Sequence, residues 1–247
     1  MKITVLTAVK NSVCTIEESI RSVIAQEGVD IEYIVLDGMS SDGTSDIISR
    51  YRGHITQLVT EEDRGLYHAL NKGISVSTGD IVAILHADDF FADSCSLKKV
   101  ADAFSSSGVS IVYGNIDIIS SKNTEKVFRR WKCRPFSMKT LKLGWCPPHT
   151  AFYARREMYE KYGCFNTDYE ISADYDLMLR FLTAAGENSR FIDETLVKMR
   201  TGGMSRNTGS SVVKKLHEDY DIIKRFKLLG PITLIAKRLR KLRQFQL

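Results

Sequence analysis

The sequence has few cysteines and no long apolar run. Its five cysteines are scattered over 247 residues and form no CxxC pair, which is typical of free thiols in a reducing cytoplasm. No stretch approaches the roughly 18 to 20 uninterrupted apolar residues that a membrane-spanning helix needs. The apolar part of the first residues, MKITVLTAVKNSV, is too short for a signal peptide. We therefore expect a cytoplasmic protein.

Internal repeats, low-complexity linkers and nucleic-acid-binding signatures are also absent. The sequence contains no RRM, KH, zinc-finger or helix-turn-helix pattern, so nucleic acid is not an expected partner. The charge is nevertheless uneven, because residues 1–120 carry 9 Lys and Arg against 17 Asp and Glu, whereas residues 121–247 carry 26 against 13. The basic half is suited to an anionic partner such as a phospholipid surface or a diphosphate.

The sequence does contain enough apolar material for a core, in alternating strand-like and helix-like segments. Hydrophobic residues make up 43% of the chain and charged residues 26%, an ordinary globular balance. In the first half each short apolar run precedes a segment with apolar residues at helical spacing, which predicts a parallel sheet covered on both faces. The predicted strands span residues 2–9, 31–38, 54–60 and 79–89, and the predicted helices span residues 15–26, 44–51, 65–77 and 96–106.

From about residue 110 this alternation gives way to a different pattern. Residues 110–132 predict a β-hairpin, and residues 149–163 predict a strand that runs into a short helix. A helix over 172–186 and a strand over 189–200 follow. No linker separates the two halves, so we expect one compact unit.

Polar clusters follow the predicted strands of the first half, where ligands bind in parallel sheets. Asp37 could accept a hydrogen bond from a nucleobase, or it could close a turn that caps the next helix. Arg64 stands at a helix N-terminus, where it could contact a phosphate or remain a solvated surface residue. Asn71 and Gly73 could be no more than a helix C-terminal signal.

Two pairs of carboxylates are candidates for chemistry. Asp88 and Asp89, in the stretch HADD, offer the oxygen ligands that Mg²⁺ and Mn²⁺ prefer, and one carboxylate with a diphosphate and waters is enough. The alternative is that both acids cap the helix that starts near residue 93. Asp174 or Asp176 could act as a general base, or both could complement the dipole of the helix they begin.

The order of these motifs resembles the family 2 glycosyltransferases of the GT-A fold. The motifs are TAVKN, DGMSSDGT, RGLYHALNKG, TGDIVAILHADD, SADYD and GGMS, and they span roughly residues 1–205. The resemblance implies an α/β, Rossmann-like, mainly parallel sheet flanked by helices. It also implies a nucleotide-sugar-binding half (1–115), an acceptor-binding and catalytic half (116–206) and a helical basic tail (207–247). Among family members, the sequence is most similar to bacterial enzymes that build capsule, O-antigen or exopolysaccharide.

The resemblance assigns roles by position. It implies that Asp88 binds Mn²⁺ or Mg²⁺, that Asp174 is the catalytic base, that Asp89 orients the donor sugar and that His149 contacts the acceptor or the donor sugar. Arg200 and the loop TGGMS would close on the diphosphate, unless the loop is a plain connection. The donor and nucleotide site would be lined by Thr7, Val9, Asn11, Asp37, Arg64, Asn71, His86, Ala87, Asp89 and Arg200.

The sequence departs from the family pattern at two positions. His86 replaces the first Asp of the DxD motif, and Ala173 replaces the acid that ordinarily precedes the base. Because the first DxD position tends toward the ribose and a histidine can hydrogen-bond a hydroxyl, the first change affects nucleotide affinity or metal tightness more than the existence of a site. Both changes also suit an alternative, a nucleotide-sugar-binding or scaffold subunit without turnover.

The resemblance implies a metal-dependent, inverting transfer of a hexosyl or N-acetylhexosaminyl group from a nucleotide-diphosphate sugar, with a UDP-sugar favoured. The implied acceptor is a hydroxyl of a polyprenyl-diphosphate-linked saccharide. A nucleotidyltransferase is the third alternative, but it would ordinarily have a glycine- and lysine-rich loop after the first strand, and TAVKNSVCT has no glycine.

The C-terminal segment is basic and amphipathic. From Ile222 onward it holds 8 Lys and Arg and no acid. This pattern predicts an interfacial helix on anionic lipid, peripheral on the inner face of the cytoplasmic membrane, or else a helix that packs on the domain or a partner. The apolar residues that recur after Pro231 are Ile232, Ile235, Leu239, Leu242 and Phe245.

Overall fold

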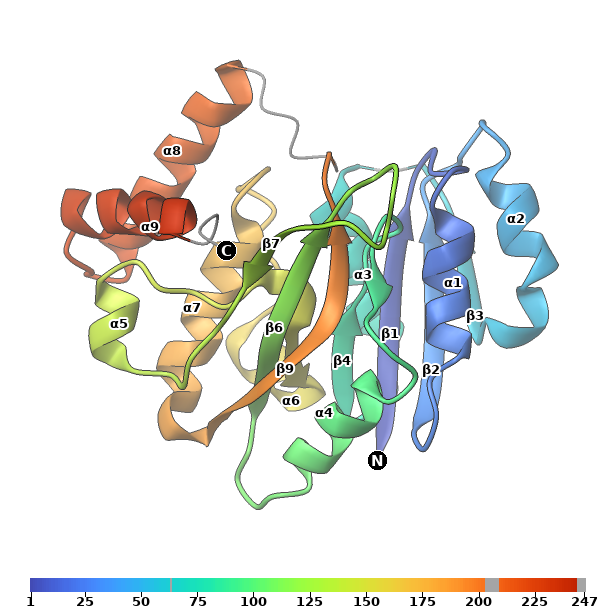
Figure 1. The fold of residues 1–247 in the computed structure, drawn as a ribbon, viewed down its shortest axis with the longest axis horizontal. Coiled ribbons are helices and arrows are strands. Elements are labelled where there is room, and N and C mark those ends of the chain that lie inside the picture. Colours follow the sequence, from blue (N-terminus) through green and yellow to red (C-terminus); the bar gives the residue numbers. More distant parts are fainter. Residues whose placement is uncertain (63, 203–208, 244–247) are drawn as a thin grey trace.

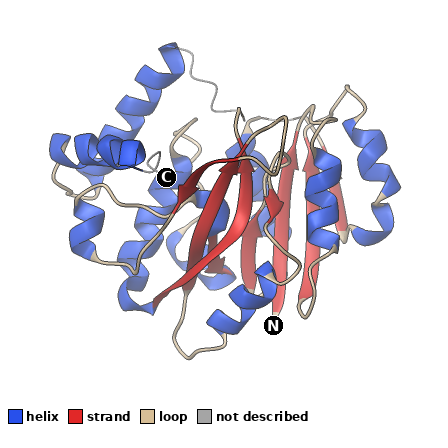
Figure 2. Ribbon diagram, in the orientation of Figure 1, coloured by secondary structure: helices blue, strands red, loops and turns tan. Residues whose placement is uncertain are grey.

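The computed structural model describes residues 1–62, 64–202 and 209–243. These residues fold around one nine-stranded sheet with helices on both faces (Figures 1 and 2). The strand order is β3-β2-β1-β4-β8-β6-β9-β5, and β7 pairs with β6 off this path. The predicted α/β fold is confirmed.

The first half of the chain forms the parallel part of the sheet, and it also supplies the short strand β5, which pairs antiparallel with β9. Its elements are β1 (Lys2–Val9), α1 (Ile16–Ile24), β2 (Asp30–Asp37), α2 (Thr44–Arg50), η1 (Arg52–His54), β3 (Gln57–Thr60), α3 (Leu66–Val76), β4 (Ile81–Ile84), β5 (Phe90–Phe91) and α4 (Ser96–Phe104). Along β1, Ile3 and Val5 pack with α1, α2 and α4, whereas Leu6 packs with α3 on the other face. Both faces of the strand are therefore buried, which is why its sequence is almost continuously apolar.

The second half adds a mixed part to the same sheet. Its elements are β6 (Ile111–Ile119), β7 (Val127–Trp131), α5 (Met138–Lys142), η2 (His149–Ala151), β8 (Phe152–Arg155), α6 (Arg156–Tyr162), α7 (Ala173–Ala185), η3 (Gly186–Asn188) and β9 (Ser189–Arg200). β6 and β7 form the predicted antiparallel hairpin, β8 runs antiparallel to both β4 and β6, and β9 runs parallel to β6. β8 thus joins the two parts into one sheet.

The fourth strand is shorter than the sequence predicts. It ends at Ile84 instead of Asp89, because the chain turns and the backbone N–H of Asp89 donates to the carbonyl of His86 at 3.0 Å. The next two residues form β5, which pairs with β9. The HADD stretch therefore lies on a tight turn beyond the carboxyl end of β4, held between two strands.

Two helices follow the sheet, α8 (Gly209–Arg225) and α9 (Pro231–Arg243). α8 contacts α7 and α9, and its Ile222 and Ile223 are fully buried in the core on the α7 side of the sheet. Figure 1 shows both helices at one flank of the molecule, beside α5 and α7. None of the helices among the described residues is long and apolar enough to cross a membrane.

Candidate active site

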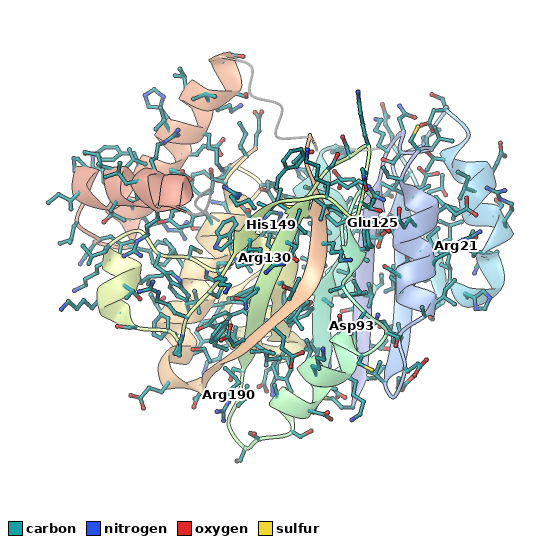
Figure 3. The ribbon with its side chains drawn as sticks, viewed as in Figure 1. Arg21, Asp93, Glu125, Arg130, His149 and Arg190 are labelled. Atoms are coloured by element: carbon teal, nitrogen blue, oxygen red, sulfur yellow. The ribbon has the colours of Figure 1, made fainter. Side chains whose placement is uncertain are left out.

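The candidate residues come together at one edge of the sheet. β1, β2 and β4 are parallel, so their carboxyl ends, which precede Asn11, the turn after Asp37 and the HADD turn, lie at the same edge. η2 and the start of α7 bring His149 and Asp174 to this edge from the second half of the chain. In Figure 3, His149 lies in the half of the molecule toward which β1 and β6 point.

The turn after β2 is held by Asp37 itself. One carboxylate oxygen accepts from the N–H and hydroxyl of Ser40 at 3.1 and 2.6 Å, and the other accepts from the hydroxyl of Ser45 at 2.7 Å. Asn11, in the left-handed region at φ 51°, accepts from the N–H of Ser41 at 2.9 Å. These contacts close the turn after β2, but α2 has no side-chain hydrogen bond at its N-cap, Gly43, so Asp37 does not cap the helix as the alternative expected. The structure leaves its role in base recognition a prediction.

The other residues assigned to the nucleotide side differ in accessibility. Thr7 is fully buried and its hydroxyl accepts from Tyr33 at 3.3 Å, while Val9 is buried at the end of β1. Arg64 is exposed just before α3. Asn71 exchanges two hydrogen bonds with the backbone of Phe165, at 2.9 and 2.8 Å, and so ties α3 to the segment after α6. The assigned contacts with the nucleotide remain predictions.

The HADD turn rests on Arg200, the last residue of β9. The Arg200 backbone N–H donates to the Asp89 carboxylate at 3.1 Å, and its guanidinium donates to the carbonyl of Asp88 at 2.6 Å. The same guanidinium forms an ion pair with Glu18 of α1 and lies 5.0 Å from the ring centre of Phe90. Arg200 therefore supports the turn from inside the protein. Its assigned contact with a diphosphate remains a prediction, and Gly203, Met204 and Ser205 of the TGGMS loop lie outside the described residues.

The two carboxylates of this turn lie in a poorly solvated place, which disfavours their charged forms. Burial raises the pKa of Asp88, and burial together with the neighbouring Asp88 raises the pKa of Asp89 well above its usual value. Ala87 and Asp89 are buried, whereas Asp88 is partly open to solvent. A cation beside Asp88 would offset the cost of ionising these carboxylates, so the turn fits a divalent metal held by one protein carboxylate and ligand oxygens. Among the described residues, no group of three or more His, Cys, Asp and Glu is arranged to hold a metal by itself.

His149 lies between the HADD turn and Asp174. Its ring centre is 5.2 Å from that of His86, and its Nδ1 is 3.4 Å from a carboxylate oxygen of Asp174. Burial, and then the charge of His149, lower the pKa of His86 to about 3, so that His86 is a neutral ring. A neutral imidazole offers both a donor and an acceptor to a hydroxyl.

α7 presents one of its two acids to the site and buries the other. Asp176 is fully buried and pairs with Arg180 at 2.9 Å and Arg225 at 3.1 Å. The side chain of Asp174 is 23% exposed beside His149. Burial raises the pKa of Asp174, but His149, Lys215 and Lys237 outweigh it and hold this pKa below its usual value. Of the two acids, Asp174 is therefore the one placed to accept a proton.

The sequence did not reveal that α8 and α9 contribute to this site. Lys215 of α8 and Lys237 of α9 both act on the charge of Asp174, although they are 41 and 63 residues away in the chain. The available signal was the helical spacing of apolar residues in α8, which ends in the buried pair Ile222 and Ile223. That spacing indicates that the helix packs on the domain, but it does not indicate where.

Comparison with known proteins identifies the family. The model of the family described as Glycosyl transferase family 2 matches residues 4–163, more than half of the chain. The chain belongs to this family. A PGL/p-HBAD biosynthesis glycosyltransferase of Mycobacterium bovis is 27% identical over 191 residues, which cover 76% of this chain and 72% of that protein. The family membership confirms the resemblance inferred from the motifs.

Solved structures share the fold of this family 2 glycosyltransferase. Residues 1–349 of Staphylococcus aureus TarS, in complex with UDP-GlcNAc, align with a TM-score of 0.69 and 17% identity over 92% of this chain, which spans 65% of the length of that structure. A glucosyl-3-phosphoglycerate synthase of Mycobacterium tuberculosis, in complex with Mn²⁺, UDP and glucosyl-3-phosphoglycerate, aligns with a TM-score of 0.64 and 17% identity, over 92% of this chain and 80% of that one. A Pyrobaculum calidifontis mannosyltransferase in complex with GDP-Man and Mn²⁺ aligns with a TM-score of 0.63 and 22% identity, over 95% of this chain and 68% of that one.

Proposed function

We propose that this glycosyltransferase moves a sugar, with inversion, from a UDP-sugar to a hydroxyl of a lipid-linked saccharide during synthesis of a cell-surface polysaccharide. The observation that carries the proposal is the placement of the HADD turn and Asp174 on either side of His149. In this proposal a metal-compatible carboxylate and an ionised base face one reaction centre. The complexes of the structural neighbours with UDP, UDP-GlcNAc and Mn²⁺ support the choice of donor.

In this mechanism each described residue has one task. Asp174, ionised at neutral pH, accepts the proton of the attacking hydroxyl, and His149 at 3.4 Å restrains the carboxylate. Asp88 would hold Mn²⁺ or Mg²⁺, which offsets charge on the leaving diphosphate. Asp89 and Arg200 keep the HADD turn in place beneath the donor. His86, a neutral ring, would hydrogen-bond the ribose.

The two halves of the chain divide the substrates in this proposal. Residues 1–115 would bind the nucleotide at the carboxyl ends of the parallel strands, and residues 116–206 would bind the acceptor beside η2 and α7. Residues 207–247 form the tail. A hexosyl or N-acetylhexosaminyl group would be transferred, since both are common parts of the UDP-sugars that the neighbours' complexes suggest.

A thermal-shift panel tests the choice of donor. Ligand that binds the folded state stabilises it by mass action, so one UDP-sugar with Mn²⁺ should raise the melting temperature more than GDP- and dTDP-sugars do. The same sugar should release UDP in the presence of Mn²⁺. A larger shift with a GDP-sugar would overturn the choice of UDP, and shifts without any turnover would favour the scaffold alternative.

The outer face of α9 supports attachment to a membrane. Ile232, Ile235 and Leu239, one to two turns apart, are 59%, 58% and 55% exposed and form an outer stripe. Arg238 beside them is exposed too. Apolar side chains flanked by cations suit the boundary of an anionic bilayer, which we propose as the partner of this stripe. The side chain of Leu242 and all of Phe245, the remaining members of the predicted pattern, lie outside the described residues.

Replacing Ile235 and Leu239 together by Ser should weaken binding to vesicles of phosphatidylglycerol and phosphatidylcholine by about 10²-fold, because each buried side chain contributes about 1.5 to 3 kcal/mol. Vesicle co-sedimentation measures the loss. Val213→Ser, at an exposed apolar position of α8, is the matched control and should bind like the wild type. Equal sedimentation of the double variant and the wild type would refute the proposal.

A further inference from the structure

The inner face of α9 is attached to the catalytic half of the protein. The hydroxyl of buried Thr233 donates to the carbonyl of Lys142 at 2.6 Å, and Arg240 donates to the carbonyl of Leu143 at 2.9 Å. Gly144 lies so close that a Cβ there would be 2.5 Å from the backbone nitrogen of Lys237. α9 therefore has a fixed position on the protein that does not require a membrane.

Lys237 points from this inner face into the protein. Its side chain is 13% exposed, and its ammonium lies 2.9 Å from a carboxylate oxygen of Asp219 and 3.1 Å from the ring centre of Tyr175. A buried ammonium is stable only when it is paired, and an aromatic face stabilises it further. Lys237 thus joins three helices, because Asp219 belongs to α8 and Tyr175 to α7.

α8 continues this connection to the segment that immediately precedes α7, the helix on which Asp174 lies. Asp219 accepts from the hydroxyl of Ser172 at 3.0 Å. Its neighbour Glu218 accepts three backbone hydrogen bonds, from Glu170 at 3.1 Å, Ile171 at 3.0 Å and Ser172 at 2.8 Å. Ser172 precedes the first residue of α7, and Asp174 is the second. Two carboxylates of α8 therefore fix the backbone that immediately precedes Asp174.

We propose that Lys237 and Glu218 are positioning residues for Asp174, which makes the C-terminal helices part of the catalytic machinery. The inference rests on the proposed role of Asp174 as base. Lys237 fixes Tyr175, next to the base in sequence, and Glu218 fixes the segment before it. A displacement of about 1 Å in a reacting group can reduce the rate about 10²-fold, so a base in the first turn of a helix needs such support.

The charge of Lys237 also acts on the base. The titratable groups that interact with Asp174 are His149 of η2, Tyr67 of α3, His86 of the HADD turn, Lys215 of α8 and Lys237 of α9. Lys237 lowers the pKa of Asp174, so its removal raises that pKa, and the acidic limb of the rate profile moves to higher pH. A residue that only stabilised the fold would not move this limb.

The test compares Lys237→Met with Lys224→Met in the full chain. Lys224 is an exposed residue of α8 whose ammonium also lies over a tyrosine ring, at 5.3 Å from Tyr220. The assay is Mn²⁺-dependent release of UDP from the UDP-sugar that gives the largest thermal shift. Lys237→Met should lower kcat at least about tenfold and leave KM for the donor within about twofold. It should also move the acidic limb of the rate profile to higher pH. Lys237→Arg, which keeps the positive charge, should restore part of kcat. Lys224→Met should match the wild type.

Glu218→Gln keeps the shape of the side chain and serves if Lys237→Met fails to fold. It should lower kcat with KM for the donor unchanged. The inference would be overturned if Lys237→Met and Glu218→Gln had the same kcat and the same acidic limb as the wild type. It would also be overturned if Lys224→Met lowered kcat as much as Lys237→Met does. Asp174→Asn separates the proposed role of the base from the positioning inference. If Asp174→Asn abolishes turnover while Lys237→Met and Glu218→Gln change neither kcat nor the acidic limb, only the positioning inference fails. If Asp174→Asn turns over normally, the proposed role of the base fails.

Discussion

Asp174→Asn should lower the kcat for UDP release by about 10³-fold, since positioned proton transfer contributes about 10² to 10⁴. Asn keeps the shape of the side chain and cannot accept the proton. The thermal shift caused by the UDP-sugar with Mn²⁺ should persist, because Asp174 is assigned to the acceptor side of the reaction. A steady-state UDP assay and a melting curve measure the two effects.

The pH dependence of the wild type should have a specific direction. In the proposed mechanism Asp174 works as the ionised carboxylate, and its pKa lies below the usual value because His149, Lys215 and Lys237 outweigh the effect of burial. The rate should therefore stay constant as the pH falls from neutrality and should decline only near or below about pH 4, the ordinary range of an aspartate. A decline centred near pH 6 would show that another group limits the reaction.

Asp176→Asn is the matched control for this base. It makes the same chemical change two residues later on α7, but at a fully buried carboxylate paired with Arg180 and Arg225. Breaking a buried pair destabilises a protein by about 3 to 5 kcal/mol. This variant should melt at a lower temperature while its folded fraction keeps the kcat of the wild type. A loss of kcat without a loss of stability would assign the base to Asp176.

Asp88→Asn should abolish the Mn²⁺-dependent part of the thermal shift and lower kcat by about 10³-fold, because a metal ion supplies several kcal/mol of charge stabilisation to a departing diphosphate. Without metal, the variant should be at least as stable as the wild type, since Asp88 adds negative charge beside buried Asp89. Melting curves with and without Mn²⁺ measure both effects.

The control for Asp88 is Asp102→Asn, an exposed acid on α4 that pairs only with Lys98 at 2.9 Å among the described contacts. It should keep the full effect of Mn²⁺. An Asp88→Asn protein that binds the UDP-sugar and responds to Mn²⁺ like the wild type would contradict the metal assignment. It would then favour a nucleotide-sugar-binding subunit without metal-dependent turnover.

Elements with strong local signals could be predicted from the sequence. β1, β2 and the helices after them follow from apolar periodicity, and the β6–β7 hairpin follows from two strand-like runs around SSKN. β5 has two residues and forms only because β9 pairs with it. The fourth strand was predicted too long because the apolar run continues into a turn closed by one backbone hydrogen bond. Such pairings depend on residues far apart in the chain, which local patterns do not report.

Some residues of the candidate site could likewise be predicted from the sequence, whereas the roles of others depend on contacts between distant segments. HADD and SADYD could be recognised because each motif is continuous in the sequence. The choice between Asp174 and Asp176 could not be made from the sequence, because it depends on Arg225, 49 residues away on α8. That segment was predicted to be helical, but its packing against α7 was not predicted. The role of Arg200 beneath the HADD turn likewise depends on β9 lying beside β5.

The sequence by itself determined the family, the parallel half of the sheet and the two acidic motifs, since these are carried by continuous stretches of residues. Only the tertiary structure decided that His149 lies between His86 and Asp174 and that Asp176 is a buried ion-pair residue. It also decided that the basic C-terminal segment has an inner face joined, through Asp219 and Tyr175, to the residues beside Asp174. The physical reason is that burial and pairing set the state of a charged group, and both arise from contacts between segments distant in the chain.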